Sequence, residues 1–409
     1  MTRKPQPLPP LMPQTGITRL LSTPEYYHAC IGSSPQTLDS AREIIFIIEG
    51  EGQADKNVWQ QALDQVSRHN PGTRLRMVGN RLRARWQSDG APPRLRLVEN
   101  CPWDGQSDAG SEFLYREALS LDTGPVMELI IATGTKTRVM VRVLHAAMDG
   151  IGVMHFYQEL FRALRHEPLL GSNAGFSDTD LMLSIASDVR PQKKQPPAAL
   201  TGGARGERRG DTWQRLSLLS PQPALLARTA LAVAEFARQH STQAVRIALP
   251  VNLRRHCPGL LSTLNFSSMI HVDVAAGDGP DDFRRKVAAL LASARETSYP
   301  AWLDYVRLLP LSWLDRLVSR TEKNYRQRKL LETVVLSNIG NFSSQSLSGG
   351  GFVAQRIFGL PMKDNPFFIM FGMDGQVDIT IGMAHVYASE GRLESFLRFM
   401  QNRLDGNGT

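Results

Sequence analysis

The stretch VRVLHAAMDGIGVMHFYQELF, residues 141 to 161, decides how this sequence is interpreted. It opens with an apolar, β-branched run that is typical of a buried strand, and it places His145 at the end of that run. Asp149 and Gly150 follow, directly before apolar residues at helical spacing. The stretch therefore predicts a strand, a short loop and an amphipathic helix that packs back on the sheet.

His145 is the candidate for chemistry in this loop. A side chain at a strand end is held by a rigid element and still faces a cleft. Because the ordinary pKa of histidine lies near neutrality, His145 can take a proton from a hydroxyl or an amine. Asp149 is expected to lock the loop by pairing with an arginine, and Gly150 to supply backbone freedom for a tight turn. The hexapeptide HAAMDG alone also fits a core histidine beside a turn aspartate.

The residues before this stretch alternate between strand and helix patterns. Gly79 and Asn80 mark a turn between two strands, and Pro71 ends a helix. Four apolar residues define one face of that helix: Trp59, Ala62, Leu63 and Val66. The predicted strands cover 43–49, 73–79, 80–86, 93–98, 126–134 and 137–145, and the predicted helices cover 56–71, 111–119 and 150–165.

The second half mixes strands and helices in the same way. Asp374 and Gly375 mark a hairpin turn, and Ser220 and Ser389 are candidate N-caps of two helices. The predicted helices cover 220–240, 281–299, 311–329 and 389–404, and the predicted strands cover 244–255, 332–340 and the hairpin 367–386. The fold class predicted from both halves is α/β (α+β).

Length and composition favour two lobes. A chain of 409 residues suits two lobes of about 200 residues each. Residues 172–212 are dense in Pro, Gly and charge and have little to bury. We therefore expect an N-terminal lobe over 1–175, an exposed crossover over 176–211 and a C-terminal lobe over 212–409.

Composition also limits the classes of function. The net charge of +8 favours an acidic partner, but the sequence has no zinc finger, RNP motif or basic zipper, so no nucleic acid is expected. Three cysteines without CxxC spacing predict neither a disulfide framework nor a metal site. No apolar run is long enough for a membrane span, and prolines interrupt the first residues, so a cytoplasmic location is expected.

The motif HAAMDG resembles the active-site motif of the condensation-domain and chloramphenicol-acetyltransferase-like superfamily, usually written HHxxxDG. Three further stretches are similar to superfamily motifs in the expected order: WQQALDQVSRHNPGTRLRMV (59–78), ALPVNLRR (248–255) and VVLSNIGNF (334–342). Together these matches span roughly residues 40 to 385. Leu144 stands where the motif has its first histidine, and the DFGWG of plant acyltransferases is absent.

The resemblance implies a pseudo-dimer of two acetyltransferase-like lobes with a tunnel between them. An acyl thioester would enter from one side and an acceptor from the other. His145 is then the catalytic base, while Asp149 is structural, is bridged to Arg254, and has Gly150 beside it to keep the loop tight. Candidates for stabilising an oxyanion or lining the tunnel are Ser337, Asn338 and the backbone around Gly340. The alternative is that Asn338 and Gly340 only shape the strand end.

The expected function is a stand-alone acyltransferase of natural-product or lipid metabolism. It would move an acyl group from acyl-CoA or a phosphopantetheinyl thioester to an acceptor hydroxyl and form an ester. The sequence has no G-x-S-x-G elbow, so no covalent acyl-enzyme is expected. The implied partners are an acyl or peptidyl carrier protein or coenzyme A and a small-molecule acceptor, without a permanently bound cofactor. The alternatives are a free-standing condensation enzyme that forms an amide, and a catalytically silent scaffold that binds a carrier protein.

Four other histidines carry weaker expectations. His155 is expected in the core or behind the site, because its helical neighbours are apolar. His271 and His385 are structural by default, although His271 alternates in a strand and has the option of facing the tunnel. His28 is a further candidate for lining the entrance of the tunnel, although no pattern in the sequence places it there.

Overall fold

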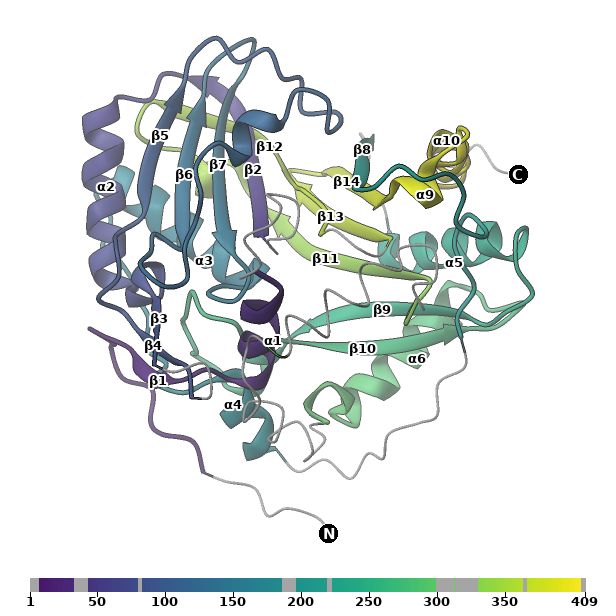
Figure 1. The fold of residues 1–409 in the computed structure, drawn as a ribbon, viewed down its shortest axis with the longest axis horizontal. Coiled ribbons are helices and arrows are strands. Elements are labelled where there is room, and N and C mark those ends of the chain that lie inside the picture. Colours follow the sequence, from purple (N-terminus) through teal and green to yellow (C-terminus); the bar gives the residue numbers. More distant parts are fainter. Residues whose placement is uncertain are drawn as a thin grey trace.

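The computed structural model describes residues 7–32, 43–79, 83–185, 196–218, 223–298, 313, 330–362 and 366–405. Figure 1 shows two halves side by side, each with a twisted sheet and covering helices. Mixed strands and helices in both halves confirm the α/β class predicted from the sequence. None of the helices in these ranges combines the length and hydropathy that a membrane crossing requires.

The first half is built on a five-stranded sheet with the order β12-β2-β7-β6-β5. Its strands are β12 (Phe352–Gly359), β2 (Glu43–Gly52), β7 (Thr137–Leu144), β6 (Met127–Ala132) and β5 (Arg94–Val98). Helices α2 (Lys56–His69) and α3 (Gly150–Leu164) bury their apolar faces in the core of this half. The predicted face of α2 is confirmed, because Trp59, Ala62, Leu63 and Val66 are all buried.

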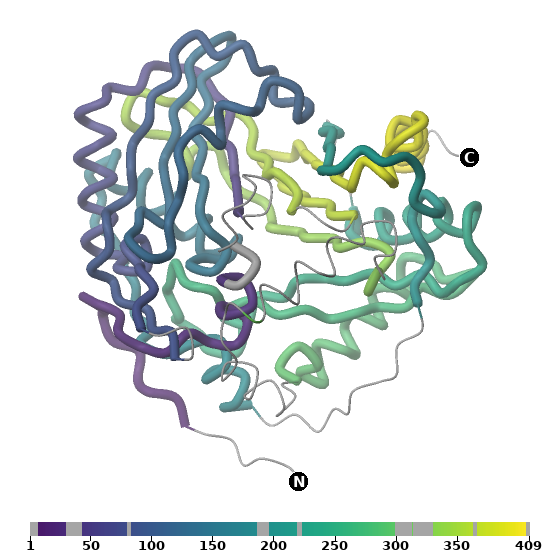
Figure 2. Tube along the Cα trace, in the orientation of Figure 1, coloured from purple at the N-terminus to yellow at the C-terminus, as the bar shows by residue number. Residues whose placement is uncertain are grey.

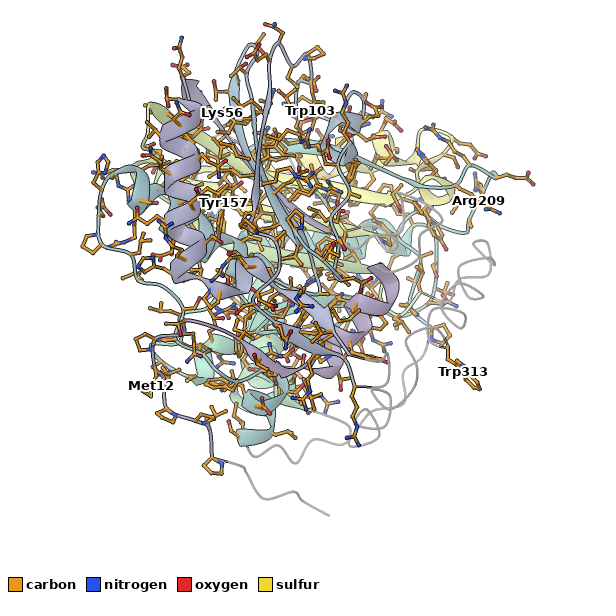
Figure 3. The ribbon with its side chains drawn as sticks, turned by 60° about the vertical axis from the view of Figure 1, so that its left-hand side comes forward. Met12, Lys56, Trp103, Tyr157, Arg209 and Trp313 are labelled. Atoms are coloured by element: carbon orange, nitrogen blue, oxygen red, sulfur yellow. The ribbon has the colours of Figure 1, made fainter. Side chains whose placement is uncertain are left out.

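Tyr157 fixes α3 to this sheet. Its hydroxyl donates to the Phe46 carbonyl at 2.6 Å and accepts the Val141 N–H at 2.9 Å. Figure 3 shows Tyr157 inside the first half. Since Phe46 belongs to β2 and Val141 to β7, one side chain holds the helix after Asp149 against two strands.

The second half is built on a six-stranded mixed sheet with the order β10-β9-β11-β13-β14-β8. Its strands are β10 (Ser267–Val274), β9 (Val245–Asn252), β11 (Val334–Phe342), β13 (Phe367–Met373), β14 (Gln376–Ala384) and β8 (Asp211–Leu218). Helices α5 (Leu225–Arg238), α6 (Pro280–Ala292), α9 (His385–Ala388) and α10 (Arg392–Leu404) contribute to the core on one of its faces. The predicted hairpin is confirmed, with left-handed Asp374 and Gly375 at its turn.

Shorter elements complete the described fold. A small sheet has the order β1-β4-β3 and consists of β1 (Thr18–Leu20), β4 (Arg85–Gln87) and β3 (Arg76–Val78). Helix α1 (Thr23–Gly32) follows β1, and α4 (Asp178–Ser184) follows α3. The 3-10 turns are η1 (Pro71–Arg74), η2 (Glu112–Tyr115), η3 (Leu253–His256), η4 (Arg295–Thr297) and η6 (Ser344–Leu347).

Three predicted helices differ from the structure. The helix expected over 281–299 ends at Ala292, and left-handed Ala294 separates it from η4. The helix expected over 111–119 is the single turn η2, and Arg96 donates to the Phe113 and Leu114 carbonyls that a longer helix would use. Helix α10 begins after left-handed Gly391, and the Ser389 hydroxyl accepts a hydrogen bond from the Arg392 side chain, so Ser389 is not the N-cap.

Two other predictions fall outside the described residues. Ser220 and the helix expected over 311–329 lie outside the described residues, apart from Trp313. The described part of the helix expected over 220–240 is α5, which begins at Leu225.

The stretch expected as an exposed crossover is partly buried. Helix α4 carries a capping box between Ser177 and Asp180, and Leu181 is fully buried. Residues 205–209 are exposed, and Arg209 projects at the periphery in Figure 3. The difference is explained by apolar side chains that are buried in the described parts of this segment: Phe176, Leu181, Met182, Ala198 and Leu200.

Strand β12 connects the two halves. It lies far along the chain and yet pairs antiparallel with β2, so the first sheet takes one of its two edge strands from the second half of the sequence. Figure 2 shows this light-green segment beside the purple strand. The lobe boundaries at 175 and 212 stay a prediction. Strand β12 follows residue 212 in the sequence but pairs within the sheet of the first half.

A buried ion-pair network also links the sheets. The Glu49 carboxylate accepts from Arg138 at 2.8 Å and from Arg215 at 2.7 Å. Arg215 donates to Asp378 at 2.7 Å, and Arg356 donates to the same carboxylate at 2.9 Å. Since Glu49 lies on β2 and Asp378 on β14, the network joins both sheets away from solvent.

Candidate active site

A cavity of about 510 Å³ lies between one face of the second sheet and the first half of the chain. Four strands form its floor, mainly through alternate residues, as expected from the two-residue period of a strand. These alternate residues are Ser267, Met269 and His271 of β10, Pro250 and Asn252 of β9, Val335, Ser337 and Ile339 of β11, and Phe367 and Ile369 of β13. Of the residues between them, Ile270, Leu336 and Phe368 belong to the core on the opposite face, whereas Val251, Ser268 and Asn338 also line the cavity.

The wall opposite this floor comes from the first half of the chain and from the residues that follow β12. It consists of Pro24, Tyr27 and His28 of α1, Ile44 and Phe46 of β2, His145 to Ile151 in part, and Leu360 and Met362 after β12. His145 therefore faces a space that both halves enclose.

His145 follows the last residue of β7, as the sequence predicts. The Asn265 amide donates to the carbonyls of His145 and Ala146 at 2.8 Å and 2.9 Å. The imidazole stacks on that of His28, with 3.9 Å between ring centroids. Backbone and ring of His145 are thus held by residues from two distant segments.

Asp149 is almost fully buried and accepts four hydrogen bonds. It caps α3 by accepting the Gly152 N–H at 2.6 Å, and it accepts the Phe266 N–H at 2.7 Å. Arg254 donates to both carboxylate oxygens, at 2.9 Å and 3.2 Å. The ion pair expected between Asp149 and Arg254 is present. With these contacts, each carboxylate oxygen of Asp149 accepts two hydrogen bonds.

Gly150 differs from the expected turn glycine. It begins α3, and its φ is not in the left-handed region. A glycine is favoured here because there is little room for a side chain. A Cβ at this position would lie 3.0 Å from Phe46 Cζ and 3.2 Å from Ile339 Cδ1. Gly152 is more confined still, since its Cβ would overlap the Thr263 carbonyl oxygen.

The three candidates on β11 separate in the structure. Ser337 and Asn338 line the cavity with His145. Gly340 lines a second cavity of about 920 Å³ instead, and Asn338 borders both. The Gly340 N–H donates to Asn338 Oδ1 at 3.2 Å, next to a register shift in β11. The structure thus places Ser337 and Asn338 at the site, and Gly340 beside it.

Comparison with known proteins bears on the fold. No family model matches the sequence, and no curated protein matches it either. Among solved structures, a variant of the starter condensation domain of rhizomide synthetase RzmA in complex with C8-CoA superposes with a TM-score of 0.66 at 16% identity, covering 96% of each chain. The epimerization domain from the third module of tyrocidine synthetase B gives 0.56 at 15% identity, covering 96% of this chain and 98% of that one.

The chain has the condensation-domain fold. The resemblance noted in the sequence is therefore confirmed for the fold, and the pseudo-dimer of lobes remains a prediction. Another RzmA starter domain structure, in complex with C8-CoA and Leu-SNAC, has a TM-score of 0.63 at 17% identity, covering 96% of this chain and 95% of that chain.

The other histidines take different places within this condensation-domain fold. His271 lines the cavity, with its Nε2 3.6 Å from Glu332 Oε2. His155 is buried behind the site and bonds the Gly171 carbonyl, and burial lowers its pKa. His385 lies at the start of α9, where partial burial lowers its pKa.

Sequence reasoning missed several residues that shape the site. Asn265 and Phe266 hold the loop through contacts that no local pattern indicates. Gly152 had a signal in the sequence, because glycine inside a helical pattern indicates a close backbone approach. Across the described residues, no group of three or more His, Cys, Asp or Glu side chains is arranged to hold a metal ion.

Proposed function

We propose that this chain is an acyltransferase that moves an acyl group from a coenzyme A or carrier-protein thioester to an acceptor hydroxyl. The observation that carries the proposal is the position of His145, at a strand end in a cavity that both halves enclose. A base in that place meets two substrates that enter a shared space, which lowers the entropic barrier of their reaction.

His145 acts as the general base. As the acceptor oxygen attacks the thioester carbonyl carbon, its proton passes to a ring nitrogen of His145. The tetrahedral intermediate collapses with cleavage of the C–S bond, and the imidazolium returns the proton to the departing thiolate. The products are the ester and the free thiol, and no enzyme nucleophile takes part.

The developing oxyanion needs a hydrogen-bond donor. Ser337 and Asn338 are the side chains that we assign to this role, because both line the cavity with His145. Gly340 suits it less, since its N–H already donates to Asn338 Oδ1.

The cavity fits a thioester with an apolar acyl group. Apolar side chains gather on its floor and wall: Ile44, Phe46, Leu360, Met362, Phe367 and Ile369. The RzmA starter domain, which shares the fold, was crystallised with C8-CoA, and this supports a coenzyme A thioester as a first substrate to test. A carrier-protein thioester presents the same reacting group.

Amide formation is the second candidate, because the same base can deprotonate an amine. An RzmA starter domain was also crystallised with C8-CoA and Leu-SNAC together. The acceptor distinguishes the two reactions, so alcohols and aminoacyl thioesters have to be compared side by side.

The test is transfer from octanoyl-CoA, and from an octanoyl carrier protein, to a panel of alcohols and amines, measured by thiol release and by mass spectrometry of the products. We expect ester products from the wild type and a loss of at least about 100-fold in His145→Ala. His69→Ala is the matched control, because His69 is exposed on α2. Equal turnover in wild type and His145→Ala would disprove the base, and no turnover with coenzyme A or carrier thioesters would favour a silent scaffold.

A further inference from the structure

A second imidazole lies against the proposed base. The rings of His28 and His145 are stacked, with 3.9 Å between centroids and 17° between planes. Both residues line the cavity. They come from α1 and from the loop after β7, so their contact is a tertiary one that the fold has to build.

Helix α1 presents one face to the cavity. Pro24, Tyr27 and His28 line it, at the spacing of three and four residues that brings side chains onto one helix face. Tyr26 and Ala29, on the other side, are buried in the core of the first half. The helix is therefore seated, with His28 directed inward.

Ion pairing fixes the first turn of α1. Arg19 donates two hydrogen bonds to Glu25, at 2.7 Å and 2.6 Å, and the Ser22 N–H donates to the same carboxylate at 2.8 Å. Glu25 is fully buried. A helix held in this way gives His28 a defined position in place of the freedom of a surface side chain.

The stack limits how the His145 ring can turn. A histidine side chain rotates about two bonds, and the terminal rotation is soft, so a lone imidazole samples many ring planes. Proton transfer needs a ring nitrogen aimed at the acceptor within about 3 Å. A flat ring at 3.9 Å blocks the planes that would collide with it and leaves those parallel to it.

We propose that His28 is a positioning residue, whose stacked ring fixes the plane of the His145 imidazole for proton transfer. This role rests on the proposed function, since it takes His145 as the base. The stack itself is a property of the fold and can be measured without turnover.

The test compares His28→Ala, which removes the ring, with His28→Phe, which keeps a flat ring. Histidine-selective 15N NMR reports the ring nitrogens of His145, identified by their loss in His145→Ala. Turnover of octanoyl-CoA with the best acceptor gives kcat and KM for each variant. His69→Ala is the matched control, and His28→Gln replaces His28→Ala if the alanine variant melts at a markedly lower temperature.

We expect His28→Ala to move the His145 ring signals and to lower kcat about 10- to 100-fold, with KM within about twofold, because a misplaced base slows the chemical step. His28→Phe should restore most of kcat. Unchanged His145 signals and kcat in His28→Ala would overturn the proposal, as would a His28→Phe variant as slow as His28→Ala. If the wild type transfers no acyl group, the proposed function fails. Unchanged His145 ring signals in His28→Ala would in that case still show that His28 does not position the His145 ring.

Discussion

Arg254 donates from both terminal nitrogens to the carboxylate of Asp149, across 105 residues of sequence. The same arginine donates to the Ser262 and Leu264 carbonyls, and its guanidinium lies 5.2 Å from the centre of the Phe266 ring. Arg254 thus connects the loop that carries His145 with the segment that follows β9. The loop depends on the second half of the chain for its shape.

Breaking this ion pair should destabilise the fold and the site together. Asp149→Ala leaves Arg254 buried without its partner and removes the N-cap of α3. Loss of one member of a buried pair costs about 3–5 kcal/mol, so we expect the free energy of unfolding to fall by that order. Urea denaturation and acyl transfer measure the two effects. A fully stable Asp149→Ala variant without activity would contradict the structural role and favour a direct one.

Glycine substitutions should differ according to the space around each Cβ. Gly150→Ala meets two side-chain atoms that can shift, and overpacking of this kind costs about 1–3 kcal/mol. Gly152→Ala meets the Thr263 backbone and should cost more. Gly203→Ala is the control, since nothing lies within 4 Å of its Cβ position. Thermal denaturation ranks the three, and equal melting temperatures would show that space is not the constraint.

The contribution of Tyr157 to the free energy of unfolding should decline at alkaline pH. Burial raises the pKa of its hydroxyl, so the native state keeps this proton at pH values where the unfolded chain has lost it. Its contribution is therefore complete below about pH 10 and declines above, by about 1.4 kcal/mol per pH unit. Tyr157→Phe should show a shallower alkaline decline than the wild type in urea unfolding. Parallel curves above pH 10 would contradict this.

Asp178 should make stability depend on pH in the mildly acidic range. Burial raises its pKa to about 7, and the nearby Glu25 carboxylate adds to the shift. The native state then holds a proton between about pH 4 and pH 7 that the unfolded chain releases, so this group's contribution falls as the pH rises through that window. Asp178→Asn keeps the shape and removes the titration. We expect a flatter pH profile of the unfolding free energy, and an unaltered profile would refute the assignment.

The sequence alone was sufficient where the fold depends on local periodicity. Strand β2, helices α2 and α3 and the hairpin β13-β14 lie where their residues predict them, because the buried residues recur at the period of each element. The same reasoning failed over 111–119, where Arg96 of β5 donates to carbonyls that a helix would use. A helical pattern carries no record of such distant donors.

The site, like the fold, was predictable from the sequence only in its local parts. His145 and Asp149 stand in one short motif, and their order relative to a strand and a helix follows from sequence. The stack with His28 depends on how α1 packs beside the loop after β7, and the amide contact from Asn265, 120 residues away, depends on how the two halves pack. Such contacts have no periodic signature, and for that reason they could not be inferred.

The pairing of β12 with β2 has a consequence for how the chain folds during synthesis. The edge of β2 has to wait for its partner until residue 359 has left the ribosome, roughly 300 positions later. Through that interval an apolar strand with unpaired backbone groups is open to other chains, which is a known route to aggregation. Contacts of such long sequence separation also slow folding. Expression at low temperature, or with chaperones that shield strand edges, should therefore raise the yield of folded protein.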